Sequence, residues 1–247
     1  MRFLTDANLP TGKISLAAVC ECEQDITTEL EKLNISSLEL PPNPFVDKRL
    51  SGHADLSLLH IEGNIAAVSK SCTDILKSKG FEVVVPDGAQ SEKYPFDCIL
   101  NALILKKKVF ANTSALDKKI SAFLLEKGFE IIHINQGYSK CMTAVINENA
   151  VITCDKSVKQ AADAHKIDAL IIRQGFIRLD GFEYGFIGGC CGLIDRNILA
   201  FSGKIENHPD YVLMRDFALS HSVKLLSLTE EKLKDIGGIL PIQEGEV

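Results

Sequence analysis

Two kinds of side chain in the sequence could together perform nucleophilic catalysis: a histidine close to an aspartate, and cysteines in glycine-rich stretches. His53 and Asp55 are separated by a single alanine. Histidine exchanges protons near neutral pH, and a carboxylate binds cationic groups through charge-assisted hydrogen bonds. A cysteine held beside His53 would have its pKa lowered, and its thiolate would be a strong nucleophile. These residues are therefore candidates for a cysteine-dependent reaction.

Two glycine-rich stretches supply the candidate cysteines. Cys141 lies in the segment GYSKCMT at 137–143, and Cys190 and Cys191 lie in GGCCG at 188–192. Because neighbouring residues of a strand point to opposite faces, at most one of Cys190 and Cys191 can reach a shared site. Any of these cysteines can instead be a small buried hydrophobe. The residues alone leave Cys141 and one of Cys190 and Cys191 open as alternatives.

Other polar residues give weaker signals. Asp97 stands at the start of an expected strand and is a second carboxylate candidate, although an aspartate there is often only solvated. On alternating strand positions, His53 and Asp55 would face the same side, which also suits a simple mutual hydrogen bond. The six histidines are scattered, and no pair has the spacing of a helical or ribbon-type zinc site. We expect no metal ion and no cofactor.

Composition and charge narrow the class of protein. The 247 residues are 46% hydrophobic and 24% charged, so the chain can bury a sizeable core. A net charge of −6 without a basic run argues against nucleic-acid binding. No apolar run is long enough to span a bilayer, and the N-terminus has no apolar region of a signal peptide. We expect a cytoplasmic protein with its eight cysteines reduced and no membrane association; the residues do not indicate its oligomeric state.

The elements that must position these residues are clearest in the segment 51–85. Its pattern predicts strand, strand, helix, strand. The expected strands are Leu56–Ile61, Ile65–Val68 and Phe81–Val85. Ser69 is placed to start the helix, which is expected to end at Lys79. Gly80 can then take the positive φ that commonly ends a helix.

Variants of this pattern recur along the chain. The repeated units lie at about 11–42, 51–88, 95–135, 137–175 and 186–230, followed by a closing strand at 239–242. The segment GFEII at 128–132 repeats GFEVV at 80–84 almost residue for residue. In the third unit we expect an inner strand over Cys98–Leu105, and before the closing strand a short helix over Glu230–Lys234.

Five such units favour one particular architecture. A helix in every unit excludes the all-β propellers, and an ordinary doubly wound sheet has no place for a hairpin before every helix. We predict an α/β fold in which five ββαβ units form a propeller with pseudo-fivefold symmetry, built as a single domain over residues 1–247. The closing strand would pair with the first unit and leave no free sheet edge around the central pore.

At this point the sequence resembles a known group, the pentein superfamily, which has the guanidino-group-modifying enzyme fold and includes deiminases and amidinotransferases. In those enzymes a His-x-Asp motif precedes a cysteine nucleophile that often lies in a glycine-rich Cys-x-Thr context. His53-Ala54-Asp55 matches the first motif, and Cys141-Met142-Thr143 is similar to the second. The enzymes' nucleophile comes from the last repeat, which by position favours Cys190 or Cys191.

The resemblance implies a cysteine-dependent hydrolase or transferase that acts on a small guanidine or amidine compound. Asp55, and with it Asp97, would hold the planar cation through paired hydrogen bonds while the thiolate attacks its central carbon. His53 would protonate the leaving amine and then deprotonate the water that hydrolyses the thiouronium adduct. The alternative is a non-catalytic protein that binds a ligand or partner, since the superfamily also contains a ribosome anti-association factor. The distance from His53 to each cysteine sulfur should distinguish these possibilities.

Overall fold

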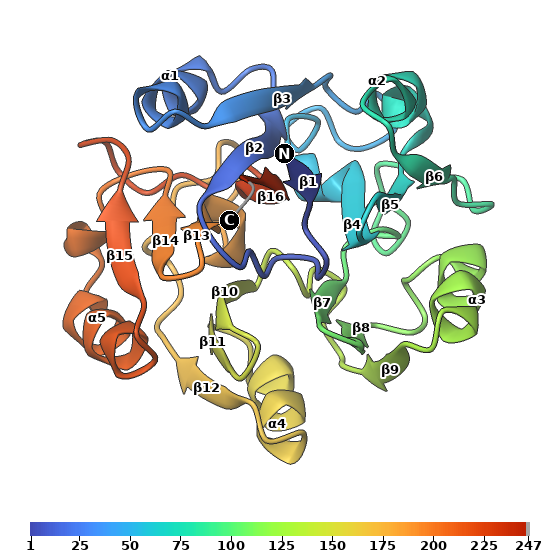
Figure 1. Ribbon diagram of the computed structural model, residues 1–247. Coiled ribbons are helices and arrows are strands. Elements are labelled where there is room, and N and C mark those ends of the chain that lie inside the picture. The colour runs from blue at the N-terminus through green and yellow to red at the C-terminus, as the bar shows by residue number, and fades with distance from the viewer. Residues whose placement is uncertain (246–247) are drawn as a thin grey trace.

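Five small sheets surround a common centre. The computed structural model of the chain describes residues 1–245. One sheet has four strands and each of the others has three. Figure 1 shows the sheets following one another around the molecule in chain order, with helices α1 to α5 at the outer rim. The first strands of the units therefore lie nearest the centre, where residues from different units can meet.

The second unit illustrates the repeated pattern. It contains β4 (Leu58–Glu62), β5 (Ile65–Val68), α2 (Thr73–Ser78) and β6 (Glu82–Val84). β4 pairs with β5 antiparallel, and β5 pairs with β6 parallel. A tight turn suffices for the antiparallel pair, whereas the parallel pair needs a crossover, which α2 supplies. The predicted strand, strand, helix, strand order of this segment is confirmed.

The next three units repeat this order. Their elements are β7 (Leu103–Leu105), β8 (Lys108–Ala111), α3 (Lys118–Glu126) and β9 (Glu130–His133); β10 (Thr143–Asn147), β11 (Ala150–Thr153), α4 (Lys156–Ala164) and β12 (Asp168–Ile171); and β13 (Cys191–Asp195), β14 (Ile198–Phe201), α5 (Tyr211–Ser220) and β15 (Lys224–Ser227). Short 3₁₀ turns are η1 (Ala54–Leu56), η2 (Lys70–Cys72), η3 (Gly188–Cys190) and η4 (Ile205–Asn207). In each unit the first two strands are antiparallel and the last two parallel.

The first sheet joins the two ends of the chain. It contains β1 (Arg2–Phe3), β2 (Ile14–Cys20), β3 (Ser36–Leu40) and β16 (Leu240–Glu244), with α1 (Gln24–Lys32) between β2 and β3. The strand order is β1-β16-β2-β3. β16 is antiparallel to β2 and takes the place of the inner strand that the other units supply from their own segments. The predicted pairing of the closing strand with the first unit is confirmed.

Local sequence signals account for several element ends. Asp155 accepts hydrogen bonds from the backbone N–H groups of Ser157 and Val158 at 2.8 and 3.0 Å, which caps the N-terminus of α4. Gly80 follows α2 with φ +88, as predicted, and Gly128 follows α3 with φ +78. These helices therefore end where the sequence allows the chain to reverse toward the outer strand.

Three central segments differ from the prediction. His53 and Asp55 do not share a strand, because the 3₁₀ turn η1 precedes β4. Cys98–Asn101 precede β7 as turns, and 230–234 contains no helix. The reason is that these backbones bond to other parts of the centre: the Asp55 N–H donates to Gly237 O at 3.1 Å, for example. Apolar character alone does not reveal such contacts between units.

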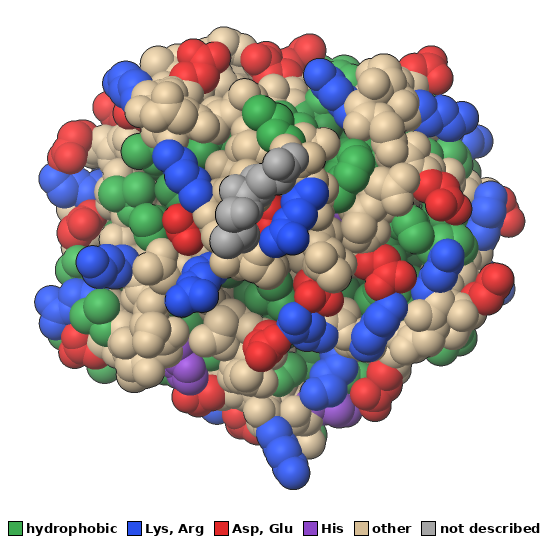
Figure 2. Space-filling model, in the orientation of Figure 1, with side chains coloured by type: hydrophobic (Ala, Val, Ile, Leu, Met, Phe, Trp, Pro, Cys, Tyr) green, Lys and Arg blue, Asp and Glu red, His purple; other side chains and the backbone are tan. Residues whose placement is uncertain are grey.

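Buried apolar side chains fill the space between neighbouring units. One cluster combines Leu103 and Phe110 of the third unit with Ile146 of the fourth and Leu199 and Phe201 of the fifth. Such shared packing holds adjacent sheets in fixed positions. On the face in Figure 2, acidic and basic side chains are interspersed. Within residues 1–245, none of the helices has the length and apolar character needed to cross a membrane.

Candidate functional site

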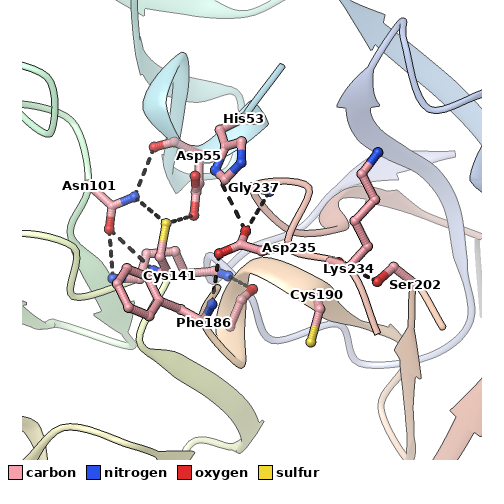
Figure 3. A network of polar contacts seen from close by, with 12 residues as sticks. His53, Asp55, Asn101, Cys141, Phe186, Cys190, Ser202, Lys234, Asp235 and Gly237 are labelled. Carbon is pink, nitrogen blue, oxygen red and sulfur yellow. Dashed lines mark hydrogen bonds and ion pairs between the residues drawn. The ribbon is translucent and has the colours of Figure 1, made fainter. Parts of the chain in front are cut away.

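Residues from the second and fourth units converge at the centre of the molecule. His53, Asp55 and Cys141 are only 6%, 2% and 2% exposed. One potential ligand atom from each lies within 4.8 Å of the other two. The Cys141 thiol donates a hydrogen bond to Asp55 Oδ2 at 2.7 Å (Figure 3). Of the two alternatives that the sequence left open, Cys141 is the cysteine beside His53.

A second carboxylate, Asp235, lies on the other side of the histidine. Its Oδ1 is 3.6 Å from His53 Nδ1. The backbone N–H groups of Phe186 and Gly237 donate to its two oxygens at 2.8 and 3.1 Å. A Cβ added to Gly189 would lie 1.9 Å from Asp235 Oδ1, so only glycine lets this carboxylate approach. Asp235 itself lies in the segment between the fifth unit and the closing strand. Its carboxylate is fixed by the two backbone hydrogen bonds and by the close approach of Gly189.

Asn101 positions the thiol from the third unit. Its Nδ2 donates to Cys141 Sγ at 3.2 Å, and its Oδ1 accepts from the backbone N–H groups of Lys140 and Cys141 at 2.9 and 3.3 Å. The side chain of Asn101 thus holds both the backbone and the sulfur of residue 141. Because Asn101 is itself buried, these bonds are shielded from competing water.

A small cavity adjoins this cluster. Its volume is about 100 Å³, and its lining residues combine polar groups of the cluster with apolar and aromatic walls. They are Leu50, His53, Leu56, Tyr138, Cys141, Leu179, Phe182, Tyr184, Phe186 and Asp235. The rings of Tyr138 and Tyr184 lie 6.0 and 6.2 Å from that of Phe186. The cavity can hold a small molecule with a flat, partly apolar surface and a polar group facing the cluster.

Burial determines the protonation of the cluster. It raises the pKa of Asp55, although the positive charge of Lys140 acts in the opposite direction. Burial also raises the pKa of Cys141 well above its usual value, and the charges of Asp55 and Asp235 raise it further. The thiol is therefore protonated and donates its hydrogen bond to Asp55. This reverses the predicted lowering of the cysteine pKa, because a carboxylate is the group in direct contact with the sulfur.

The other predicted site residues lie apart from this cluster. Cys190 is buried in η3 and donates to Ile187 O at 3.1 Å. Figure 3 shows its sulfur pointing away from His53, Asp55 and Cys141. Asp97 accepts a short hydrogen bond from Tyr138 and does not line the cavity, so it contacts the cavity wall from behind.

Sequence reasoning missed three residues of the site. They are Asn101, Lys140 and Asp235. Lys140 is buried and donates from Nζ to Gly188 O at 3.3 Å. Asp235 is separated by Ile236 from the adjacent glycines Gly237 and Gly238, just before the closing strand, and an acidic residue so close to a glycine pair is the one signal that could have identified it. Nothing comparable distinguishes Asn101 from other polar residues at the start of a strand.

Comparison with known proteins agrees with this architecture. A family model described as "Family of unknown function (DUF6873)" matches residues 19–240. No curated protein matches the chain. Among solved structures, inosamine-phosphate amidinotransferase from Streptomyces griseus is similar, with a TM-score of 0.60 and 10% sequence identity over 100% of this chain and 98% of that chain.

Two further solved structures are similar at the same level. DDAH from Pseudomonas aeruginosa, in complex with citrulline, has a TM-score of 0.56 and 10% identity over 93% of this chain and 96% of that chain. Agmatine deiminase from C. jejuni has a TM-score of 0.56 and 10% identity over 98% of this chain and 97% of that chain. The chain thus has the pentein fold, and the resemblance seen in its sequence is confirmed. At this identity the likeness concerns the fold alone.

Proposed function

We propose that this chain, which belongs to the family of unknown function DUF6873, is a cysteine-dependent hydrolase or transferase that acts on a small guanidine or amidine compound. The observation that carries the proposal is the convergence of one thiol, one imidazole and two carboxylates, of which Cys141, His53 and Asp235 line a cavity and Asp55 lies directly behind the sulfur. This set contains a nucleophile, a group that can exchange protons, and partners for a planar cation.

Charge balance favours a singly charged cation as the substrate. The cluster contains two buried carboxyl groups, those of Asp55 and Asp235, and one buried amine, that of Lys140, so a positive charge in the cavity would counteract the burial that raises the pKa of Asp55. A guanidinium or amidinium ion would supply this positive charge, and its N–H groups would pair with carboxylate oxygens. The aromatic walls formed by Tyr138 and Phe186 would cover the flat face of such a cation.

The cavity also restricts the substrate's size and charge. Its volume of about 100 Å³ suits a compact molecule, and its lining includes no lysine or arginine to pair with a substrate carboxylate. We therefore assign to it a guanidine or amidine with at most a short alkyl substituent rather than a free amino acid. Leu50, Leu56 and Leu179 would contact that substituent.

The reaction follows from these positions. The positive charge of the substrate would favour transfer of the Cys141 proton to His53, and the sulfur would then form a bond to the central carbon of the substrate. His53 would give this proton to the amine as the bond from carbon to that nitrogen breaks. In a hydrolase, His53 would next take a proton from water as the new carbon–oxygen bond forms and the carbon–sulfur bond breaks, and would return that proton to the sulfur. In a transferase, an acceptor amine would take the place of water.

The position of the site also bears on the architecture. We infer that the five units are the blades of an α/β propeller within a single domain, with the site near its axis. This inference is supported by the pairing of β16 with β2, which joins the last segment of the chain to the first unit. It explains why residues from the second, third, fourth and last segments of the chain contribute to one cluster.

A specific observation favours a second function, the non-catalytic binding of a cationic ligand. The pKa of Cys141 is raised, so the site contains a thiol rather than a thiolate. In that case the same carboxylates and aromatic walls would bind a small cation without forming a covalent bond.

One experiment separates the two functions. The purified chain is incubated with a panel of guanidine, short N-alkylguanidines and amidines, while released ammonia or amine is measured and the intact protein mass is recorded. We expect product release and a transient mass increase located on the peptide containing Cys141. Saturable binding with neither product nor adduct would instead support the binding function, and absence of both binding and turnover across the panel would contradict both.

A further inference from the structure

We propose that His53, Asp55 and Cys141 form a binding site for a divalent ion of the zinc class, with one coordination position open to the adjacent cavity. This inference extends beyond the proposed reaction and does not depend on it, because it concerns what the three side chains can ligate together. It also departs from the sequence-based expectation of no metal, which considered only spacing along the chain.

The three side chains supply a selective set of donor atoms. An imidazole nitrogen, a carboxylate oxygen and a thiolate sulfur are all ligands of zinc, whereas magnesium and calcium prefer sites made only of oxygen. Three protein ligands with a fourth, open position are typical of catalytic rather than structural zinc sites. His53 precedes η1, Asp55 lies in η1 and Cys141 lies in the turn before β10, so the three ligands do not have the close spacing of a zinc motif along the chain.

The positions of the donor atoms require only small side-chain adjustments. Bonds of about 2.0 to 2.3 Å to zinc place tetrahedral ligand atoms roughly 3.3 to 3.8 Å apart. Here the corresponding atoms lie within 4.8 Å of one another, and the distance from Cys141 Sγ to Asp55 Oδ2 is 2.7 Å. The sulfur and this oxygen must separate by about 1 Å as the proton between them is replaced by a metal ion.

Unused hydrogen-bonding capacity and charge favour such a replacement. Asp55 Oδ1 is buried and has no hydrogen-bond partner among the described residues. Three acidic side chains, those of Asp55, Asp235 and Cys141, are buried together with a single lysine, Lys140. A divalent ion would compensate for this excess of acidic groups over basic ones.

The surrounding residues resemble the outer shell of a metal site. Asp235 lies against the imidazole of His53, and in zinc sites a carboxylate in this position orients the histidine ligand. Asn101 donates to Cys141 Sγ, a bond that stabilises a thiolate as well as a thiol. The imidazole and the sulfur are thus held by partners from other segments of the chain before any ion arrives.

The test uses Co²⁺ as an optical substitute for zinc. The wild-type chain is treated with a chelator, freed of it and titrated with Co²⁺, and absorption is recorded before and after addition of Zn²⁺. We expect saturation at one ion per chain, a sulfur-to-cobalt charge-transfer band, and loss of that band when Zn²⁺ displaces Co²⁺. No saturable band in the wild-type chain would overturn the inference.

Variants locate the ion. Cys141→Ser should remove the charge-transfer band, and His53→Gln and Asp55→Asn should each weaken binding more than Asp235→Asn, for which a loss of about 10- to 100-fold is expected. Cys190→Ser is the matched control, because that buried sulfur bonds to Ile187 O. A second control is Cys22→Ser, since the sulfurs of Cys20 and Cys22 lie 3.0 Å apart and form a competing thiol pair. Loss of the band in Cys22→Ser but not in Cys141→Ser would overturn the inference.

A measurement on the wild-type chain covers the case in which a variant fails to fold. X-ray absorption of the zinc-loaded protein should show one sulfur at about 2.3 Å together with nitrogen and oxygen ligands near 2.0 to 2.2 Å. A shell containing two or more sulfurs would contradict the assignment. Neither measurement needs a substrate, so the metal site and the proposed reaction can be tested separately. Co²⁺ binding without turnover would support the metal site and contradict the proposed hydrolase or transferase. Turnover by a chain that does not bind Co²⁺ would support the proposed reaction and contradict the metal site.

Discussion

Cys141 and Cys190 occupy similar positions in consecutive units but have different surroundings. Each lies just before the inner strand of its unit, β10 or β13, and each is buried. Burial raises the pKa of both thiols. The Cys141 thiol nevertheless bonds to a side-chain carboxylate and an amide from other units, whereas that of Cys190 bonds to the carbonyl of Ile187 three residues earlier. Position within the repeat therefore does not define the site; the partners supplied by other units do.

The fifth unit contributes space rather than a nucleophile. A Cβ added to Gly188 would lie 2.2 Å from Lys140 O, and one added to Gly189 would lie 1.9 Å from Asp235 Oδ1. The glycines beside Cys190 thus allow the fourth unit and the C-terminal segment to approach each other. The two glycine-rich cysteine stretches have different tasks, since one presents a sulfur and the other makes room for a carboxylate.

Exchanging each sulfur for oxygen is the strongest test of this contrast. Cys141→Ser should lower kcat/KM for an active guanidine by about 10³-fold or more, because a hydroxyl in this buried site is a far weaker nucleophile. Cys190→Ser should change it by less than about threefold, since a hydroxyl can keep the bond to Ile187 O. Steady-state kinetics of both purified variants, with circular dichroism to verify folding, gives the comparison. Equal losses would mean that the two cysteines are not functionally distinct.

Filling the space that Gly189 leaves for Asp235 should have the next largest effect on activity. Gly189→Ala should reduce kcat/KM by about 100-fold, because displacing Asp235 by around 1 Å misplaces a group that holds His53. The same overpacking should lower the free energy of unfolding by about 1 to 3 kcal/mol. Gly245→Ala is the matched control, since a Cβ there meets nothing within 4 Å. If Gly189→Ala kept full activity, Asp235 would have no positioning role.

Alkylation tests the charge around the two sulfurs. Without added ligand, the raised pKa of Cys141 should make its reaction with neutral iodoacetamide slow at pH 7, as for Cys190. A haloacetamidine carries a positive charge and should react with Cys141 at least about 10-fold faster than with Cys190, because the cation offsets the nearby carboxylates. Peptide mapping by mass spectrometry measures both rates, and excess guanidine should protect Cys141. Similar rates at the two cysteines would refute the proposed attraction of cations to this site.

The sequence predicted the helices and strands of the repeated units better than it predicted the central segments where the units contact one another. Alternating apolar residues and Gly80 at a helix end are local signals, and the structure confirms what they indicate. The order of the sheets and the pairing of the last strand also follow from the repeat. The element ends are determined by residues close together in the sequence, and the pairing of the last strand is determined by the number of repeated units.

The site was only partly accessible to the same reasoning. His53, Asp55 and Cys141 were identified because their residue types carry chemistry. Asp235 was missed because it is brought to His53 by a loop rather than by a regular element, and its carboxylate depends on the missing side chain of Gly189. The protonation of the thiol was predicted in the wrong direction, since no pattern along the chain shows that Asp55 contacts the sulfur.

The smallest expected effect is on the pH dependence of stability, and it concerns His60 rather than His53. His60 is a second buried histidine of the same unit, and it lies outside the cavity. Burial lowers the pKa of His60 below its usual 6.5, although its hydrogen bond to Gly63 O acts in the opposite direction. The unfolded chain therefore binds a proton first as the pH falls below about 6.5, and each unit of pKa difference removes about 1.4 kcal/mol of stability as the pH falls toward the folded-state pKa.

Replacing His60 should make this part of the pH dependence disappear. Urea unfolding of His60→Gln between pH 7 and pH 5 should show a shallower loss of stability than the wild-type chain, even if the variant is less stable at pH 7. His133→Gln, at an exposed position, is the matched control and should keep the wild-type slope. An unchanged slope in His60→Gln would mean that other groups carry the acid sensitivity. A shallower slope together with unchanged kcat/KM would show that burial of a histidine in this unit affects stability without affecting the site, so that it is the contact with Asp235 that distinguishes His53.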